Sequence, residues 1–179
     1  MQSNFERSVY SLISGDTGHR LRFLLEFLFV VAVIGILASY ALREYKTQMA
    51  RAQTSEIINL ASTLKVDIVA YRAQYGRWPR DADEAGNATL LPHDRLGRYV
   101  MTFGIGEEGV VNGYMADEEA VDVVAGQVLS LRLGVSELDS GAPIVPVCGW
   151  AKPPEGIVAS GQNATTIKPL YLPFTCKEK

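Results

Sequence analysis

The stretch that decides the fold of this chain is FLLEFLFVVAVIGILASYAL, which runs from Phe23 to Leu42. Its twenty residues are almost all apolar, and they include one charged side chain, that of Glu26. A helix rises about 1.5 Å per residue, so this stretch spans roughly 30 Å as a helix, which is the hydrocarbon thickness of a bilayer. The sequence therefore predicts a membrane-spanning helix over residues 23–42, and the carboxylate within it requires an explanation.

The orientation of this span is not set by charge counting, because three basic residues lie close on each side of it. A short leader before the span and two cysteines far beyond it favour a cytoplasmic N-terminus and an exported C-terminal part. A secretory signal peptide is the alternative, since Ser39-Tyr40-Ala41 resembles a small-residue cleavage site. The apolar run is longer than a typical signal-peptide core and contains Glu26, so we favour the span.

The helical pattern does not stop at Leu42. No proline occurs between Arg22 and Pro79, and Gly76 is a suitable C-cap. We therefore expect one helix of roughly 50 residues within the segment 22–78, about 80 Å long. Apolar residues recur at three- and four-residue spacing in its second part, which predicts a single buried face: Ile57, Leu60, Ala61, Leu64, Ile68 and Tyr71. Residues 1–21 are expected to be an irregular cytoplasmic leader, because they contain Gly15, Asp16 and Gly18.

After a polar connecting loop at 79–97, the apolar pattern changes to a period of two. In the first strand this places Tyr99, Met101 and Phe103 on one face. Turn residues separate four such segments, which predicts an antiparallel meander: 98–103, 110–115, 127–135 and 144–150. The expected fold class is α+β, with a long N-terminal helix against a four-stranded antiparallel sheet and a C-terminal region, together covering 98–179.

The two cysteines, Cys148 and Cys176, fit neither the spacing of a C-x-x-C redox motif nor a zinc site, which needs four ligands. In an exported domain they are best interpreted as one structural disulfide that holds the Gly-, Asn- and Pro-rich tail. Two buried free thiols are the alternative. Such a bridge would stabilise the domain by roughly 3–4 kcal/mol.

These features together resemble the type IV pilins, and most of all the type IVa subunits of Gram-negative bacteria. The resemblance starts with Leu25-Glu26-Phe27 leading into VVAVIGILASYAL, and continues through Tyr45 and ARAQTSE at 50–56. Late in the chain it is carried by GQVLSLRLG, by VCGW around Cys148 and by YLPFTC ending at Cys176.

The resemblance implies a structural subunit that is made as an inner-membrane precursor, cut by a prepilin peptidase and N-methylated. It then polymerises with other pilin subunits at an assembly platform into an extracellular pilus. Such filaments serve adhesion, twitching motility or DNA uptake, and the sequence does not choose among these. Glu26 falls on the position of the family's glutamate, which is thought to pair with the N-terminal amine of a neighbouring subunit. The structural alternative is a carboxylate that reaches the membrane interface from the first helical turns.

Two departures from the family pattern stand out. If Glu26 is fifth in the mature chain, Leu21 and Arg22 flank the cleaved bond, where the family has glycine followed usually by phenylalanine. Cleavage after Gly18 would place Glu26 eighth and out of register. The second departure is Arg43, which stands where the family commonly has a helix-kinking proline, so residues 40–45 should stay helical.

An atypical cleavage site suggests a second hypothesis. If the chain is not cut, Arg22 can pair with Glu26 four residues later. The product would be a membrane-anchored pilin-like protein that binds a partner or modulates assembly without polymerising. A pseudopilin of type II secretion is a third possibility, which the disulfide-closed tail disfavours.

Other patterns predict no catalysis. Residues 104–109 match G-x-G-x-x-G, but a strand follows and two glutamates would repel phosphate, so we expect a hairpin turn. The acidic residues near 81–84 and 117–122 lack the calcium spacing of an EF-hand and are expected to be solvated. We find no catalytic residues, metal ligands or cofactor motif, and expect no enzyme. A net charge of −3 with scattered basic residues indicates that no nucleic acid is required as a partner.

Overall fold

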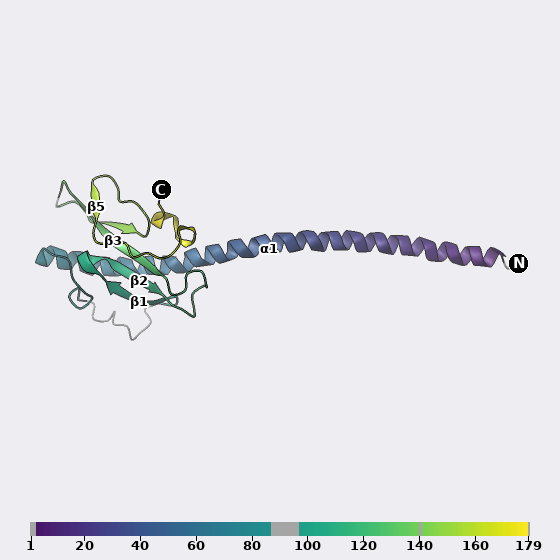
Figure 1. The fold of residues 1–179 in the computed structure, drawn as a ribbon, viewed down its shortest axis with the longest axis horizontal. Coiled ribbons are helices and arrows are strands. Elements are labelled where there is room, and N and C mark those ends of the chain that lie inside the picture. The colour runs from purple at the N-terminus through teal and green to yellow at the C-terminus, as the bar shows by residue number, and fades with distance from the viewer. Residues whose placement is uncertain (1–2, 87–96, 140, 179) are drawn as a thin grey trace. The chain divides into compact units, whose positions relative to one another are not determined.

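The computed structural model describes residues 3–86, 97–139 and 141–178. The chain divides into two compact units, residues 1–45 and residues 46–179. Helix α1, from Ser3 to Tyr75, contributes to both of them (Figure 1).

The first unit is helical from Ser3 onward, so the irregular conformation expected for the leader is wrong for residues 3–21. Gly15 and Gly18 each cost about 1 kcal/mol in a helix relative to alanine, but no proline interrupts the segment. Adding residues to an existing helix also needs no new nucleation. The expected helical conformation of residues 40–45, with Arg43 among them, is confirmed.

In the second unit, α1 ends where the sequence predicts. Gly76 has a φ of +71°, and its N–H donates to the carbonyl of Arg72 at 2.8 Å, which caps the last turn. Glycine adopts this left-handed conformation without the steric cost that a Cβ imposes. Part of the expected connecting loop, residues 87–96, lies outside the described residues.

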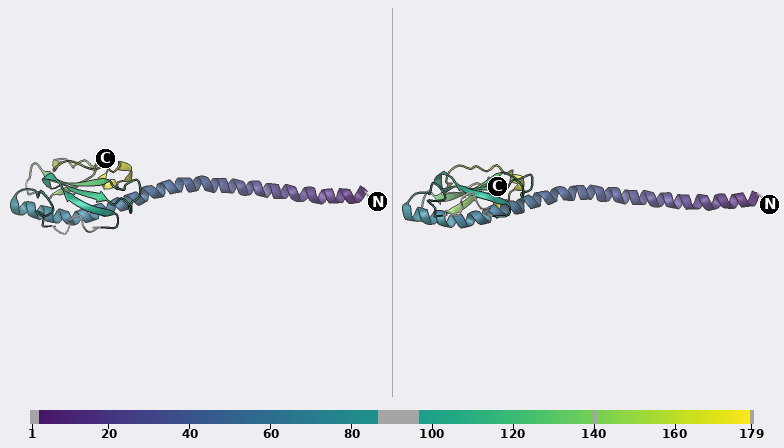
Figure 2. Two further views of the ribbon diagram at one scale, coloured as in Figure 1. Left: turned by 60° about the horizontal axis from the view of Figure 1, so that its bottom comes forward. Right: turned by 90° about the horizontal axis from the view of Figure 1, so that it is seen from below.

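The sheet has four main strands: β1 at Val100–Ile105, β2 at Val111–Met115, β3 at Val128–Ser136 and β4 at Val145–Cys148. They form an antiparallel meander in the order β1-β2-β3-β4, as expected. Figure 2 shows its strands beside the part of α1 that belongs to this unit. A short strand that the sequence did not indicate, β5 at Ile157–Ala159, pairs with the end of β3. Three residues are too few to show a period of two, which explains the omission.

The core lies between α1 and the sheet. Of the stripe predicted on the helix, Leu60 and Tyr71 are half-buried and the other four members are fully buried. The helix approaches β2 so closely that a Cβ on Gly113 would lie 2.5 Å from a methyl carbon of Ile57. The predicted inward face of β3, formed by Leu129, Leu131 and Leu133, is confirmed, since each is at most 5% exposed.

The face predicted for β1 is wrong at Met101, whereas Tyr99 packs half-buried against the core and Phe103 is buried. Met101 is 46% exposed, whereas Val100 and Phe103 are buried. The register between β1 and β2 shifts between Val100 and Thr102. A bulge adds one residue to one strand and reverses the alternation beyond it, so a strict period of two assigns the wrong side chains.

The opposite face of β3 is covered by the C-terminal tail. Ser130 is fully buried there, and its hydroxyl donates to Asn112 Oδ1 at 2.6 Å and accepts from the N–H of Ala164 at 2.9 Å. The hydroxyl of Thr165 accepts from the Ser130 N–H at 3.0 Å. The tail is therefore attached to the sheet by hydrogen bonds along β3.

Candidate functional site

The apolar stretch of the first unit is exposed on every side. Its large side chains range from 39% exposed at Val33 to 72% at Ile36. Within the described residues, this is the helix long and apolar enough to cross a membrane. A helix that is apolar all round is stable in lipid or among other helices and is not stable in water.

Arg22 and Glu26 lie next to each other on this helix. The Nε atom of Arg22 is 3.4 Å from Oε1 of Glu26, and both side chains are largely exposed. Leu21, at the other side of the atypical cleavage position, is 61% exposed. Further along the stretch, the hydroxyl of Ser39 donates to the carbonyl of Gly35 at 2.8 Å. The site that the sequence predicts is therefore a helix surface with one carboxylate and an arginine within reach of it.

The cysteines of the second unit form the predicted disulfide. Cys148 and Cys176 are bonded, with their Cα atoms 4.6 Å apart. The bond joins the end of β4 to η4, a single turn at Phe174–Cys176. Next to it, the N–H of Trp150 donates to the Cys176 carbonyl at 3.0 Å. The segment at Cys176 is thus held by a covalent bond and by a backbone hydrogen bond.

Polar side chains early in the second unit hold three different segments. Glu56 accepts two hydrogen bonds, from the N–H of Arg98 at 2.7 Å and from that of Tyr99 at 3.0 Å, at the approach to β1. Gln53 accepts from the N–H of Val121 at 2.9 Å. The hydroxyl of Thr54 donates to the Tyr171 carbonyl at 3.2 Å.

Sequence reasoning did not find these roles. Gln53 and Thr54 are buried polar residues beside the apolar stripe, and buried polar groups are nearly always hydrogen-bonded. Their position beside the predicted face was the available signal, but it does not identify the partner segments.

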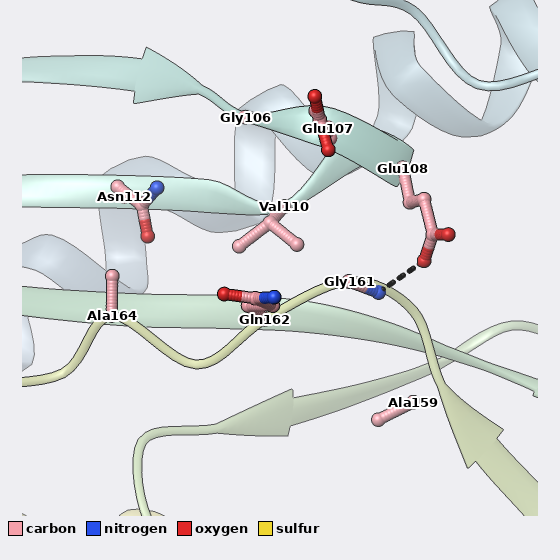
Figure 3. Close-up of a pocket in the computed structure, with 9 residues that line it drawn as sticks. All are labelled: Gly106, Glu107, Glu108, Val110, Asn112, Ala159, Gly161, Gln162 and Ala164. Atoms are coloured by element: carbon pink, nitrogen blue, oxygen red, sulfur yellow. Dashed lines mark hydrogen bonds between the residues drawn. The ribbon is translucent and has the colours of Figure 1, made fainter.

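The glycine-rich segment at 104–109 is a hairpin turn, as expected (Figure 3). The N–H of Gly106 donates to the Val110 carbonyl at 2.8 Å, and β2 follows directly. A cavity of about 520 Å³ lies beside the turn and is lined in part by Glu107 and Glu108. Glu108 accepts a hydrogen bond from the N–H of Gly161, so the turn holds the tail. These carboxylates are unsuited to a phosphate.

One acidic residue that the sequence left as solvated is an organising group. Glu84 receives two hydrogen bonds from the guanidinium of Arg77, at 2.8 and 3.1 Å, and one from the N–H of Arg80 at 2.9 Å. The hydrogen bonds from Arg77, above all, lower the pKa of Glu84 to about 2. The carboxylate fixes the chain just after α1 rather than facing solvent freely. The described residues contain no group of three or more candidate ligands that could hold a metal ion.

The chain thus combines an exposed apolar helix with a disulfide-bonded α+β unit. Residues 50–177 match the family described as Pilin (bacterial filament). The type IV major pilin protein PilE1 of Neisseria gonorrhoeae is 35% identical to this chain, over 87% of the chain and 85% of that protein. A fimbrial protein of Neisseria meningitidis serogroup B is 33% identical, over 87% and 92%. The type IV major fimbrial protein FimA of Dichelobacter nodosus is 28% identical, over 87% and 93%. The chain belongs to the pilin family, whose members are structural proteins of bacterial filaments.

Proposed function

We propose that this chain is a structural subunit of a type IV pilus that polymerises through its apolar helix. The observation that carries this proposal is the exposure of every large side chain between Phe23 and Leu42 in the isolated chain. In a filament, the helices of neighbouring subunits would cover this surface and remove it from water.

Glu26 would direct that assembly. A carboxylate in an apolar environment costs several kcal/mol unless it is neutralised or paired, so Glu26 needs a cationic partner when the helix is buried. In the polymer, the partner would be the N-terminal amine of a neighbouring subunit after cleavage between Leu21 and Arg22. Arg22 lies one turn before Glu26, close enough to compete with that amine for the carboxylate.

The route to the filament would begin in the bacterial inner membrane, with the N-terminus in the cytoplasm. A prepilin peptidase and the pilus assembly platform would be the partners at this stage. The extracellular pilus would then serve adhesion, twitching motility or DNA uptake. No catalytic step is part of this function.

The test is to shear filaments from cells that produce the chain and to probe the filaments and the inner membrane separately. We expect the wild-type chain in the filaments. Glu26→Gln should reduce the amount in filaments while leaving the chain in the membrane, and Glu44→Gln, on an exposed part of the same helix, should leave both unchanged. Retention of the wild-type chain in the inner membrane alone would overturn the proposal.

A second candidate function is supported by the contact between Arg22 and Glu26. If the chain is not cut, this arginine would neutralise the carboxylate within one chain, and the protein would remain an anchored partner or modulator of the assembly machinery. Mass spectrometry of the membrane-extracted chain separates the two functions. An N-terminus at Arg22 or His19 would exclude the uncut form, whereas an intact leader would exclude the mature subunit.

A further inference from the structure

The C-terminal segment of the second unit presents two apolar side chains to solvent. Leu170, in the single turn η3 at Pro169–Tyr171, is 53% exposed, and Phe174, at the start of η4, is 72% exposed. Between and after them, Leu172 and Cys176 are fully buried. The two turns thus divide this segment into an inward-facing set and an outward-facing set.

These exposed side chains lie on a fixed backbone. Nε of Arg51 donates to the Leu170 carbonyl at 3.1 Å, Thr54 holds the Tyr171 carbonyl, and Cys176 is in the disulfide. Because this backbone is already ordered, burying the two side chains in another medium would gain apolar burial at little further cost in backbone entropy.

The segment lies at the end of the unit at which the chain enters it. Arg51 and Thr54 are among the first residues of that unit, and Figure 1 shows the yellow turns beside this part of α1. Arg51 follows Leu42, the last residue of the apolar stretch, by nine positions. Chain length alone therefore keeps Arg51 within about 32 Å of the end of the membrane span.

The charges nearest along the chain to the two apolar residues are positive, although Glu155 lines the same cavity as Phe174 and Lys177. Lys168 precedes η3 and Lys177 follows η4. The nearby Glu178 is in an ion pair with Lys152 at 2.7 Å. By contrast, Leu138, which at 93% is the most exposed leucine among the described residues of the unit, stands between Glu137 and Asp139.

Apolar side chains flanked by lysines suit the interface of an anionic bilayer, where the side chains enter the headgroup region and the ammonium groups meet phosphates. We propose that residues 168–177 form a membrane-surface contact, with Leu170 and Phe174 inserted at the interface of the bilayer that anchors the chain. This inference rests on the membrane anchorage in the proposed function. It does not depend on polymerisation.

The test uses the full chain in vesicles of phosphatidylcholine and phosphatidylglycerol whose acyl chains carry bromine, which quenches nearby indoles. Phe174→Trp adds one indole at the proposed contact, and Leu138→Trp adds one at an even more solvent-accessible apolar position with acidic neighbours. Trp78 and Trp150 are common to both variants, and the wild type gives their background. We expect strong quenching of the added fluorescence for Phe174→Trp and little for Leu138→Trp.

The lysines supply a second measurement. Each lysine near an anionic surface contributes roughly a fivefold preference for it, so Lys168→Gln with Lys177→Gln should lower the docked-to-undocked ratio about 25-fold in the Phe174→Trp background. Quenching should then fall, and it should also fall in vesicles of phosphatidylcholine alone. Quenching that is unchanged both in the lysine double variant and in vesicles of phosphatidylcholine alone would overturn the role of the lysines.

Equal quenching of the two tryptophan variants would overturn the proposal. A blue shift of the Phe174→Trp emission that depends on the protein-to-lipid ratio but not on bromine would also overturn it, because it would assign the surface to a second copy of the chain. Flotation of the vesicles measures anchorage separately, so failure of the contact is distinguishable from failure of membrane insertion.

Discussion

One helix in this protein contains two regions that differ only in their side chains. Residues 23–42 are apolar on every face and exposed, whereas residues 46–75 bury one stripe against a sheet made by the same chain. The hydrogen-bonded backbone is helical in both. The comparison teaches that the distribution of apolar residues around a helix determines whether its partner comes from its own chain or from elsewhere.

The largest expected effect comes from making one change in both regions. Ile68 is fully buried and Ile36 is 72% exposed. Ile68→Ala should lower the free energy of unfolding of the second unit by about 2–5 kcal/mol, because it removes apolar contacts and leaves a cavity. Ile36→Ala should change it by less than about 0.5 kcal/mol. Denaturant unfolding in mild detergent, followed by near-UV circular dichroism, measures both.

Equal losses from these two substitutions would break the comparison, since they would mean that the apolar region also stabilises the folded unit of an isolated chain. Filament yield gives the reverse readout. There, Ile36→Ala should act directly on assembly, and Ile68→Ala should act only through stability.

The disulfide should give the next largest effect, again in the second region. Cys148→Ser with Cys176→Ser should lower the free energy of unfolding by roughly 3–4 kcal/mol, because the bridge closes a loop of 28 residues and restricts the unfolded chain. Thermal unfolding with and without a reductant checks this. The wild type in reductant should behave as the double variant does, and the double variant should be insensitive to reductant.

The fold could be predicted from the sequence wherever one pattern acts alone. The stripe from Ile57 to Ile68, the stop at Gly76 and the inward leucines of β3 follow from local periodicity and capping. The disulfide could be inferred because only two cysteines are present. In each case a few neighbouring residues, or a simple count, contain the information.

The remainder depends on contacts between residues that are distant in sequence. The bulge in β1 inverts a face without any glycine or proline at Met101 to mark it, and β5 is defined by its pairing to β3. The carboxylate of Glu56 holds a segment 42 residues away. Within the apolar site, periodicity places Arg22 one turn before Glu26. Whether Glu26 pairs with this arginine or with the amine of another subunit depends on whether the chain is cut, which periodicity does not reveal.

Removing the charge of Glu56 should affect stability less than removing the disulfide. It allows a comparison of two glutamates on the same helix, Glu56, which holds a distant segment, and Glu44, which is exposed. Glu56→Gln keeps the shape of the side chain but replaces one of the two accepting oxygens by a donor, so at least one backbone N–H near β1 loses its charged partner. We expect a loss of about 1–2 kcal/mol in the free energy of unfolding. Glu44→Gln is the matched control on an exposed position, and its effect should lie within about 0.5 kcal/mol of zero.

Glu56 also limits which side chain fits at position 97. A Cβ on Gly97 would lie against Glu56 Oε1, so Gly97→Ala should destabilise the wild type. The same substitution should cost less in a Glu56→Ala background, where the carboxylate is gone. Additive effects of the two changes would contradict this close approach.

The smallest expected effect compares the two acid–base pairs. Arg77 donates two hydrogen bonds to Glu84, whereas Arg22 makes a single, longer contact with Glu26. The pKa of Glu84 in the folded protein is about 2, below its ordinary value of 4.5. The folded state therefore favours the ionised form, and this contribution to stability is present above pH 4.5 and is lost as the pH falls from there towards 2.

Glu84→Gln removes this titration, so the melting temperature of the second unit should fall less steeply between about pH 4.5 and 2.5 in the variant than in the wild type. Because both side chains of the pair are still partly accessible to water, the difference should be small at neutral pH. Glu26→Gln is the control in the first region, and it should leave the acid dependence of the second unit unchanged. If Glu26→Gln flattened the profile as much as Glu84→Gln, the two regions would be coupled in folding, and the helix could no longer be described as one backbone with two independent partners.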